Sequence, residues 1–351
     1  MIHFKKGNIV KADTEALVNT VNCVGIMGRG IALQFKKAYP ENFEEYRKVC
    51  KDKKLHPGMV YTYKLPILGL TQYIINFPTK RHWKGKSKLE DIQQGLKALA
   101  QEIKRLGIRS ISIPPLGCGL GGLNWETVRP IIESALGYLT DVEVDIYEPL
   151  GAPKAKEMVT RTKKPRMTVG RASLIMLVKK YLEAMLDDSI TLLEIHKLMY
   201  FLQEAGEKLR LNYKVAYYGP YAENLRHVLI LIEGHFIEGF GEGEDNPEKT
   251  ISVRPQAYSL AASYLQKHPA TKERLDSVAQ LIEGFETSYG MELLSTVHWI
   301  ATHKKPKELQ RLTSLVHEWS ERKRTIMKDE HVKIAFEKLT TLGWIHANCH
   351  K

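Results

Sequence analysis

The sequence predicts an α/β layered domain joined to a mainly α-helical second domain with a short β element. Strand-like and helix-like segments alternate over residues 1–150, whereas helical patterns prevail over residues 171–351. The length of 351 residues also suggests about two domains. Between them, residues 151–170 carry two prolines and six basic side chains without periodicity. We therefore expect this segment to be a basic linker.

In the first domain, apolar and β-branched runs predict strands at residues 16–21, 59–63, 73–77, 111–113 and 142–146. Apolar residues recur at steps of three and four from Leu89 to Leu106, which predicts an amphipathic helix. Further helices are expected over residues 31–39 and after Asn124, a favourable N-cap. Because short joints link strands to helices, we expect a ligand to bind at strand ends.

In the second domain, a crowded apolar pattern predicts a helix over residues 172–185. Thr191 and Glu194 form a capping-box pattern that opens another helix, expected to continue to Leu202. Further helices are expected near residues 255–267, 271–285, 290–302, 306–325 and 329–341. Short strands are expected only at residues 236–240 and 250–253.

The positive charge is unevenly distributed. The chain has a net charge of +12. Residues 1–150 carry 22 basic and 15 acidic side chains, residues 151–170 carry six and one, and residues 171–351 carry 24 of each. The surplus favours an anionic partner for the first half, such as nucleic acid or a phosphorylated ligand. Plain solubility is the alternative explanation.

The cysteines and the apolar runs exclude several classes of protein. The four cysteines are widely spaced and form no CxxC pair, so a disulfide scaffold and a zinc site are not expected. No apolar h-region opens the chain and no run approaches 18 apolar residues. We therefore expect a cytoplasmic protein without a membrane span, a bound metal or a cofactor.

Two glycine-rich segments follow predicted strands and precede predicted helices, at residues 19–30 and 114–122. Glycine allows the backbone to approach a ligand closely and to point successive N–H groups at it. A helix N-terminus behind each loop adds favourable interaction with an anion. The pair predicts a diphosphate site. A P-loop and an ordinary Rossmann site are disfavoured, because the GxxxxGK[ST] and GxGxxG patterns are absent.

Three segments, at residues 7–9, 18–22 and 117–120, resemble the macrodomain family. The fold of that family is a mixed sheet flanked by helices, and it binds ADP-ribose. Phe77-Pro-Thr-Lys80, Trp83 and Trp125-Glu126 are similar to the terminal ADP-ribose glycohydrolase branch. The whole chain resembles the DarG-type antitoxins of DarT–DarG systems, whose toxin ADP-ribosylates thymidine in single-stranded DNA. This resemblance implies a DNA ADP-ribosyl glycohydrolase.

The resemblance also implies roles for individual residues. It places adenine beside residues 8–9, the diphosphate between the two glycine-rich loops, and the distal ribose near Asn22 and Lys80. Lys80 is implied to be catalytic, attacking the anomeric carbon to give a covalent intermediate that water resolves. That role requires its amine to be partly deprotonated, and either desolvation or the basic residues that follow (Arg81, Lys84, Lys86 and Lys88) could lower its pKa. The implied ADP-ribose-binding residues are Asn8, Ile9, Asn22, Gly25, Ile26, Met27, Gly28, Arg29, Gly30, Thr79, Gly117, Cys118, Gly119, Leu120 and Gly121.

One position departs from the family. The related eukaryotic hydrolase has an aspartate in the second loop, where this chain has Gly121. A two-residue lysine–aspartate mechanism therefore lacks its acid. Two alternatives stay open: the first domain reads ADP-ribose without cleaving it, or its substrate is ADP-ribosylated protein.

Other candidates in the first domain have weaker support. Cys23 and Cys118 lie in the ligand loops, but no histidine is placed in sequence to activate either thiol. His82 and Trp83 stand in a basic stretch and could stack on a base while the lysines meet phosphates. The alternative is an ordinary solvated loop.

In the second domain, residues 196–202 and Tyr218-Gly-Pro-Tyr221 are similar to the Panacea, or SocA-like, domains of antitoxins. The resemblance implies that residues 171–351 bind a cognate DarT-like toxin. An acidic segment supplies a physical motive, because a toxin that grips DNA presents basic surface. Its acidic residues are Glu233, Glu238, Glu242, Glu244, Asp245 and Glu248. A solvated loop is the alternative.

Overall fold

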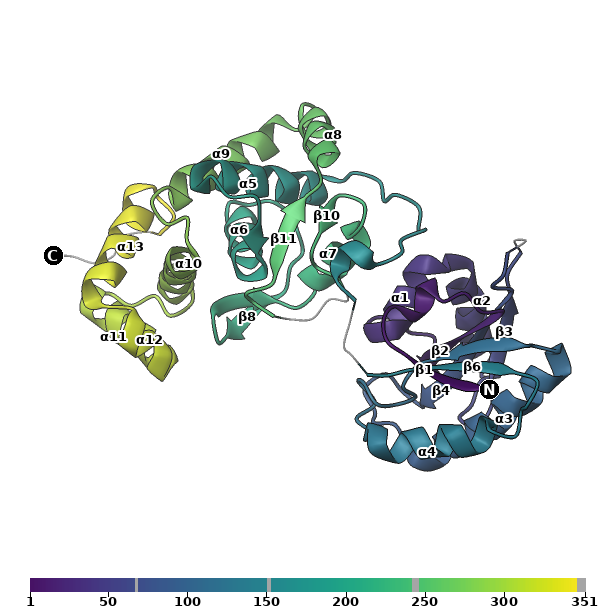
Figure 1. Cartoon of the computed structure of the whole chain (residues 1–351). Coiled ribbons are helices and arrows are strands. Elements are labelled where there is room, and N and C mark those ends of the chain that lie inside the picture. Colours follow the sequence, from purple (N-terminus) through teal and green to yellow (C-terminus); the bar gives the residue numbers. More distant parts are fainter. Residues whose placement is uncertain (67–68, 150–152, 242–245, 346–351) are drawn as a thin grey trace. The chain divides into compact units, whose positions relative to one another are not determined.

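The computed structural model of the chain forms two compact units, Met1–Lys163 and Lys164–Lys351 (Figure 1). It describes residues 1–66, 69–149, 153–241 and 246–345. The border between the units lies inside the segment that the sequence assigns to a linker. Among the described residues, none of the helices combines the length and the apolar character that a membrane span requires.

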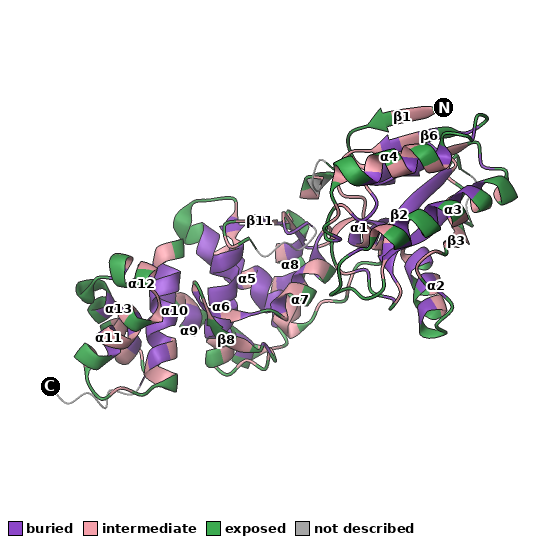
Figure 2. Cartoon of the chain, turned by 90° about the horizontal axis from the view of Figure 1, so that it is seen from below, coloured by how far each residue is buried: buried purple, intermediate pink, exposed green. Residues whose placement is uncertain are grey.

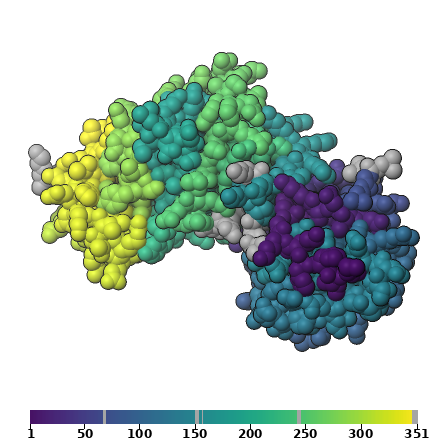
Figure 3. Space-filling model, in the orientation of Figure 1, coloured from purple at the N-terminus to yellow at the C-terminus, as the bar shows by residue number. Residues whose placement is uncertain are grey.

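The first unit is built on a six-stranded sheet of order β1-β6-β5-β2-β4-β3. Only β3 runs antiparallel to its neighbour, so the sheet is mixed, as predicted. The strands are β1 (Ile2–Lys5), β2 (Ala16–Asn22), β3 (Tyr61–Lys64), β4 (Tyr73–Lys80), β5 (Ser110–Ile113) and β6 (Glu143–Tyr147). Strand β1 was not predicted. It is a short, partly exposed edge strand on β6, and Figure 3 shows the first residues (purple) at the surface of this unit.

Helices cover both faces of this sheet (Figure 1). The predicted helices α3 (Leu89–Leu106) and α4 (Trp125–Leu136) enclose one apolar cluster with the sheet. Asn124 caps α4, accepting a hydrogen bond from the Glu126 N–H at 2.9 Å. Helices α1 (Gly30–Ala38) and α2 (Pro40–Lys51) cover the other face. Helix α2 was not predicted; its buried face includes a polar residue, Asn42.

The parallel strands place the glycine-rich loops at one edge of the sheet. β2, β4 and β5 are parallel, so their carboxyl ends lie together. The first glycine-rich loop follows β2, residues 81–88 follow β4, and the second glycine-rich loop follows β5. This edge is the place where the sequence predicts a ligand.

The second unit is a helical assembly with two small β elements. Figure 2 shows α5, α6 and α10 as its most deeply buried helices. Its helices are α5 (Val169–Met185), α6 (Leu192–Glu204), α7 (Leu225–Ile232), α8 (Pro255–Leu265), α9 (Pro269–Ile282), α10 (Ser288–His303), α11 (Leu309–Trp319), α12 (Glu321–Ile326) and α13 (Asp329–Thr341). Its strands are β7 (Ile190–Thr191), β8 (Tyr213–Ala216), β9 (Gly219–Ala222), β10 (Ile237–Glu238) and β11 (Thr250–Val253). The capping box of Thr191 and Glu194 is present.

Several elements of this unit differ from the prediction. The helix predicted over residues 306–325 is broken at Ser320, which is extended and caps α12 by accepting from the Lys323 N–H at 3.2 Å. The strand predicted over residues 236–240 is shorter and covers only β10. Gly239 ends it with a φ of +113° and packs so closely on Thr250 that a Cβ would lie 2.3 Å from the Thr250 carbonyl oxygen. The prediction of only two strands was wrong: β7 and the β8–β9 hairpin are also present, and helix α7 was missed.

Candidate active site

A register shift at the end of β4 places Lys80 beside Asn22. Val21 pairs with Pro78, but the next residue of β2, Asn22, pairs with Lys80. Thr79 is therefore the extra residue of a bulge, and its side chain is buried. Bulges next to a functional site re-aim the following side chain. Asn22 and Lys80, the two residues that the resemblance assigns to the distal ribose, are thus the last residues of the adjacent parallel strands β2 and β4.

The amine of Lys80 reaches the second glycine-rich loop. Lys80 is half-buried, and its Nζ donates a hydrogen bond to the Leu120 carbonyl oxygen. Burial lowers the pKa of Lys80, and the positive charge of Lys86 lowers it further. Both effects favour the neutral amine, the form in which lysine is a nucleophile.

Asn22 organises the first glycine-rich loop. Its Oδ1 accepts hydrogen bonds from the N–H groups of Val24 at 3.0 Å and Ile26 at 3.3 Å, and its Nδ2 donates to the Ile26 carbonyl at 2.6 Å. The Tyr46 hydroxyl donates to the Asn22 carbonyl at 2.6 Å. Asn22 therefore holds the loop in shape from within, a positioning role that sequence reasoning did not foresee.

The two glycine-rich loops approach each other at the sheet edge. A Cβ on Gly30, at the start of α1, would lie 3.6 Å from Leu120 Cδ1. Ile26 and Leu120 are exposed at 43% and 63%, one from each loop. Met27, in contrast, is buried in a cluster with Val21 and Tyr46. This placement is compatible with the predicted diphosphate cradle.

Gly121 has no room for a side chain. A Cβ there would lie 2.2 Å from the Gly117 carbonyl oxygen and 2.3 Å from Ser87 Oγ. The Ser87 N–H donates to the Gly121 carbonyl at 3.0 Å, so residues 81–88 are tied to this loop. The absence of an acid at this position is thus built into the packing of the loop.

Gly121→Ala is expected to destabilise the loop and to weaken ligand binding, because backbone must move to admit the methyl group. The cost is about 1–3 kcal/mol of unfolding free energy. Gly119→Ala is the matched control, since a Cβ at Gly119 meets nothing within 4 Å. Thermal unfolding of both variants, with and without ADP-ribose, measures the difference. Equal tolerance of the two alanines contradicts the packing argument.

At the predicted adenine end, the segment after β6 packs against residues 8–9. Asn8 caps the short helix Ile9–Lys11, accepting from the Val10 N–H at 3.0 Å, and its Nδ2 donates to the Glu157 carbonyl at 3.4 Å. Ile9 is buried. The Arg161 N–H donates to the Lys37 carbonyl at 2.8 Å. Glu157 and Arg161, which lie in the predicted linker, therefore pack as part of the first unit.

The cysteines of the loops are poorly suited to catalysis. Burial raises the pKa of Cys23 to about 11, and burial likewise raises the pKa of Cys118 to about 11. Because the thiolate is the nucleophile, such thiols are inert near neutral pH. Among the described residues, no group of three or more His, Cys, Asp or Glu is placed to hold a metal ion.

Sequence reasoning missed two residues that shape this site, Tyr46 and Ser87. Tyr46 fixes the first loop, and Ser87 packs under Gly121. Lys86 is one of the basic residues after Lys80 that were expected to lower the pKa of its amine, and its charge has that effect. Nothing in the local pattern marks Tyr46 or Ser87, since both act across long sequence separations.

In the second unit, the two halves of the Panacea-like motif contact each other. The His196 ring of α6 stacks on Tyr221 of β9 with centroids 4.4 Å apart, and Lys197 Nζ donates to the Pro220 carbonyl at 2.8 Å. Burial lowers the pKa of Lys197 to about 7, with a further contribution from Lys323. These residues fix the turn of the hairpin, where Tyr217 is 57% exposed.

A buried ion cluster lies beneath that turn. Glu292 of α10 accepts hydrogen bonds from Lys323 Nζ at 2.5 Å and from Arg322 Nη1 at 2.7 and 2.9 Å. Glu292 and Lys323 are 1% and 0% exposed. The Arg322 guanidinium also lies 4.8 Å from the ring centroid of Tyr218. The cluster joins α10 and α12 to the hairpin.

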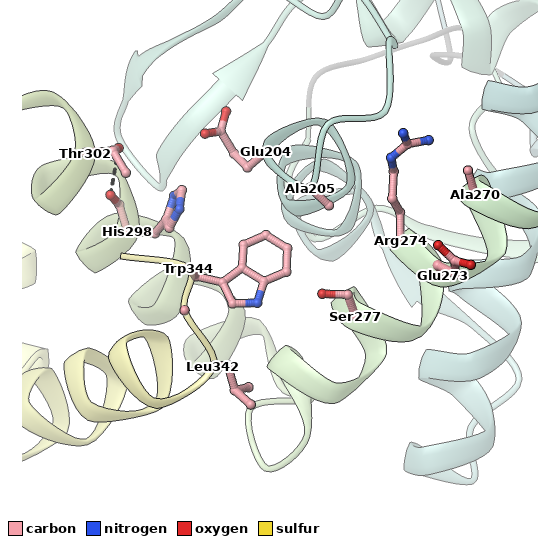
Figure 4. Close-up of a pocket in the computed structure, with 11 residues that line it drawn as sticks. Glu204, Ala205, Ala270, Glu273, Arg274, Ser277, His298, Thr302, Leu342 and Trp344 are labelled. Atoms are coloured by element: carbon pink, nitrogen blue, oxygen red, sulfur yellow. Dashed lines mark hydrogen bonds between the residues drawn. The ribbon is translucent and has the colours of Figure 1, made fainter. Parts of the chain in front are cut away.

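A shallow pocket of about 470 Å³ lies between α6, α9, α10 and the residues after α13 (Figure 4). Trp344 points into it, with Glu204 and Glu273 at the rim. His298 Nδ1 and the Tyr200 hydroxyl form a hydrogen bond of 2.7 Å. Burial lowers the pKa of His298 to about 4, so it is a neutral core residue.

The predicted acidic segment is only partly an acidic surface. Glu233 is buried and accepts hydrogen bonds from the N–H groups of Gly239 and Phe240, both at 3.2 Å. Glu238 is paired with Arg254 at 2.6 Å. Glu242, Glu244 and Asp245 lie outside the described residues. The charge argument for this segment is therefore weaker than the sequence suggested, because Glu233 is a structural cap.

Comparisons with known proteins agree with this geometry. The family model described as Macro domain matches residues 18–132, a range that contains both glycine-rich loops and Lys80. A DNA ADP-ribosyl glycohydrolase of Thermus aquaticus is 43% identical over 343 residues, covering 98% of this chain and 94% of that one.

Two further relatives cover part of the chain. A DNA ADP-ribosyl transferase–DNA ADP-ribosyl glycohydrolase fusion protein of Thermosipho africanus is 36% identical over 162 residues, covering 41% of each chain. The solved macrodomain of Mycobacterium tuberculosis DarG is 50% identical, with a TM-score of 0.42, and the match covers 42% of this chain and 98% of that one.

Proposed function

Because the chain belongs to the family of DNA ADP-ribosyl glycohydrolases, we propose that its first unit removes ADP-ribose from ADP-ribosylated thymidine in single-stranded DNA. The observation that carries this proposal is the position of the Lys80 amine, held at the sheet edge between the two glycine-rich loops. In this role the protein is the antitoxin of a DarT–DarG pair and acts in the cytoplasm, where the DNA is.

In the proposed reaction the lone pair of neutral Lys80 Nζ attacks the anomeric carbon of the distal ribose. The bond from that carbon to the thymine nitrogen breaks, and its electron pair leaves with thymine, which takes up a proton from water. A water molecule then attacks the same carbon and releases the lysine amine together with free ADP-ribose. The Leu120 carbonyl would orient the amine through one N–H, leaving the lone pair free.

The rest of the proposed binding site follows the predicted residues. Backbone N–H groups of residues 25–30 and 117–121 would hold the diphosphate, and residues 8–9 would meet adenine. No metal and no cofactor takes part in the proposed reaction. Asn22 and Thr79 would contribute by shaping the loop and the bulge, as their contacts in the free protein support.

The test is incubation of the full chain with an oligonucleotide that carries one ADP-ribosylated thymidine. Release of free ADP-ribose and recovery of the unmodified oligonucleotide support the hydrolase. Tight binding without release supports the alternative of an ADP-ribose reader. A protein ADP-ribosylated on carboxylates, presented at equal concentration, tests the other alternative. Faster release from that protein than from the oligonucleotide would overturn the choice of DNA.

We further propose that the second unit binds and inhibits the cognate DarT-like toxin. The fusion of a transferase and a glycohydrolase in one relative supports such a partnership. A fragment of residues 164–351 is expected to co-purify with the toxin and to lower its DNA ADP-ribosylation rate. A fragment of residues 1–163 is the control, which should leave that rate unchanged. Inhibition by the fragment of residues 1–163 alone would contradict the proposal and place the toxin contact in the first unit.

A further inference from the structure

Residues 81–88 form a rigid loop directly after Lys80. The Arg81 guanidinium binds the buried carboxylate of Asp91 at 3.1 and 3.3 Å. The Gly85 N–H donates to the His82 carbonyl at 3.0 Å, and Ser87 ties the far end to Gly121. The loop is thus held at both ends and across its turn. A surface that is ordered before a ligand arrives loses less entropy on binding.

Trp83, at the turn of this loop, has no structural role in the apolar core. It is 47% exposed, and it is absent from the side chains that pack on the clusters of the described first unit. Its ring contacts the neighbouring His82 ring at 5.5 Å and lies 5.0 Å from Lys84 Nζ. An exposed tryptophan on an ordered loop presents a flat apolar face to a ligand.

The charge around Trp83 is positive. Lys84, Lys86 and Lys88 are all exposed, whereas Asp91 offsets the charge of Arg81. Glu90 is the exposed acid next to this stretch. Exposed lysines interleaved with an aromatic ring are typical of surfaces that bind single-stranded nucleic acid, where bases stack and phosphates meet ammonium groups. A neutral surface would have fitted a protein substrate better.

The distance from Lys80 also fits a nucleic-acid strand. Trp83 is the third residue after Lys80, so the chain between their Cα atoms spans at most about 11 Å. Successive bases of a stacked strand are about 3.4 Å apart. A base next to the modified thymidine, or one further along, therefore comes within reach of the indole when the anomeric carbon lies at Lys80.

We propose that Trp83 is a stacking platform for a base that flanks the modified nucleotide, with Lys84, Lys86 and Lys88 meeting the phosphates of the same strand. This subsite rests on the proposed function and specifies its substrate as a strand rather than a lone nucleotide. Lys84, which now covers the indole, would exchange that contact for a phosphate when the base stacks.

The first test is equilibrium binding of a labelled, unmodified oligothymidine to the full chain, which requires no hydrolysis. Trp83→Ala is expected to weaken binding by about 5- to 150-fold, the loss typical of one stacked base. Trp83→Phe should recover part of the affinity. Lys84→Ala is expected to reduce the slope of log affinity against log salt by about 0.7.

The matched control is Tyr138→Ala. Tyr138 is 56% exposed and lies 4.6 Å from Lys104 Nζ, so it is also an exposed aromatic ring beside a lysine. It precedes β6 and thus lies toward the opposite edge of the sheet from Lys80. An equal loss in Trp83→Ala and Tyr138→Ala, or no loss in Trp83→Ala, overturns the platform.

The second test compares two substrates by kcat/KM. Trp83→Ala should lose activity on an ADP-ribosylated oligonucleotide and keep it on the ADP-ribosylated mononucleoside, which has no flanking base. The same loss on both substrates rejects the platform. If the parent protein cleaves neither, the proposed hydrolysis fails, while the binding comparison still decides the role of Trp83.

Discussion

Lys80→Ala is expected to lower the release of ADP-ribose from thymidine-modified DNA by at least about a thousandfold, because it removes the proposed nucleophile. Lys80→Arg separates nucleophilicity from charge. Arginine keeps the cation but stays protonated, so it cannot attack carbon. Both variants should be equally inactive if Lys80 acts as a nucleophile. Recovery of activity by arginine alone would instead assign an electrostatic role to the side chain.

Two controls complete this prediction. ADP-ribose binding by calorimetry should change little in both variants, since the proposed diphosphate site is made of backbone groups. Activity should also rise with pH through the pKa of Lys80, because the reactive form is the neutral amine. Lys86→Met removes a positive neighbour that lowers the pKa of Lys80. The rising limb of the pH profile should therefore move to higher pH, and a shift to lower pH contradicts this account.

Glu292→Gln is expected to destabilise the second unit by about 3 kcal/mol, which for a unit of this size is roughly 6 to 12 °C in Tm. The substitution keeps the volume but leaves Lys323, which is fully buried, without its anionic partner. Arg322 loses the same carboxylate. A buried charge without compensation is costly, whereas the intact pair is close to neutral in stability.

Asp276→Asn is the matched control for Glu292→Gln. Asp276 pairs with Lys180 at 2.9 Å, but the two side chains are 69% and 38% exposed, so its loss should cost less than about 1 kcal/mol. Hydrogen exchange of peptides from α10 reports on the second unit alone. Unchanged protection of α10 in Glu292→Gln would falsify the role given to the cluster. Toxin binding should weaken as well if the hairpin above the cluster is the contact.

Most strands and helices of the first unit were predictable because they have strong local patterns. The apolar stripe of helix α3 and the N-cap of helix α4 can each be recognised from residues that are close together in the sequence. Strand β1 was missed because it exists through its pairing with β6, a partner that no local pattern contains. Helix α2 does carry a local signal that went unused, since Pro40 opens it and the buried Phe43, Tyr46 and Cys50 follow at helical spacing.

The site was predictable as a region but not as a mechanism. Glycine-rich loops after strands indicate where a ligand binds, and the resemblance singled out Lys80. The bulge at Thr79 and the crowding of Gly121 against Ser87 depend on contacts between segments that are distant in sequence. The influence of Lys86 on the pKa of Lys80 was foreseeable, because the two residues are close in sequence. In the second unit, Glu233 was assigned to an acidic surface because its backbone partners, Gly239 and Phe240, are not visible in a charge pattern.

The crowding at Gly121 has a consequence for which bonds the enzyme cuts. With no side chain possible there, that position cannot protonate a departing group. Thymine departs through its imide nitrogen, where two carbonyl groups delocalise the negative charge, so it needs no acid. A serine oxygen would depart as an alkoxide, with no such delocalisation. From the proposed mechanism we therefore expect imide and carboxylate linkages to be cleaved and ADP-ribosylated serine to be left intact.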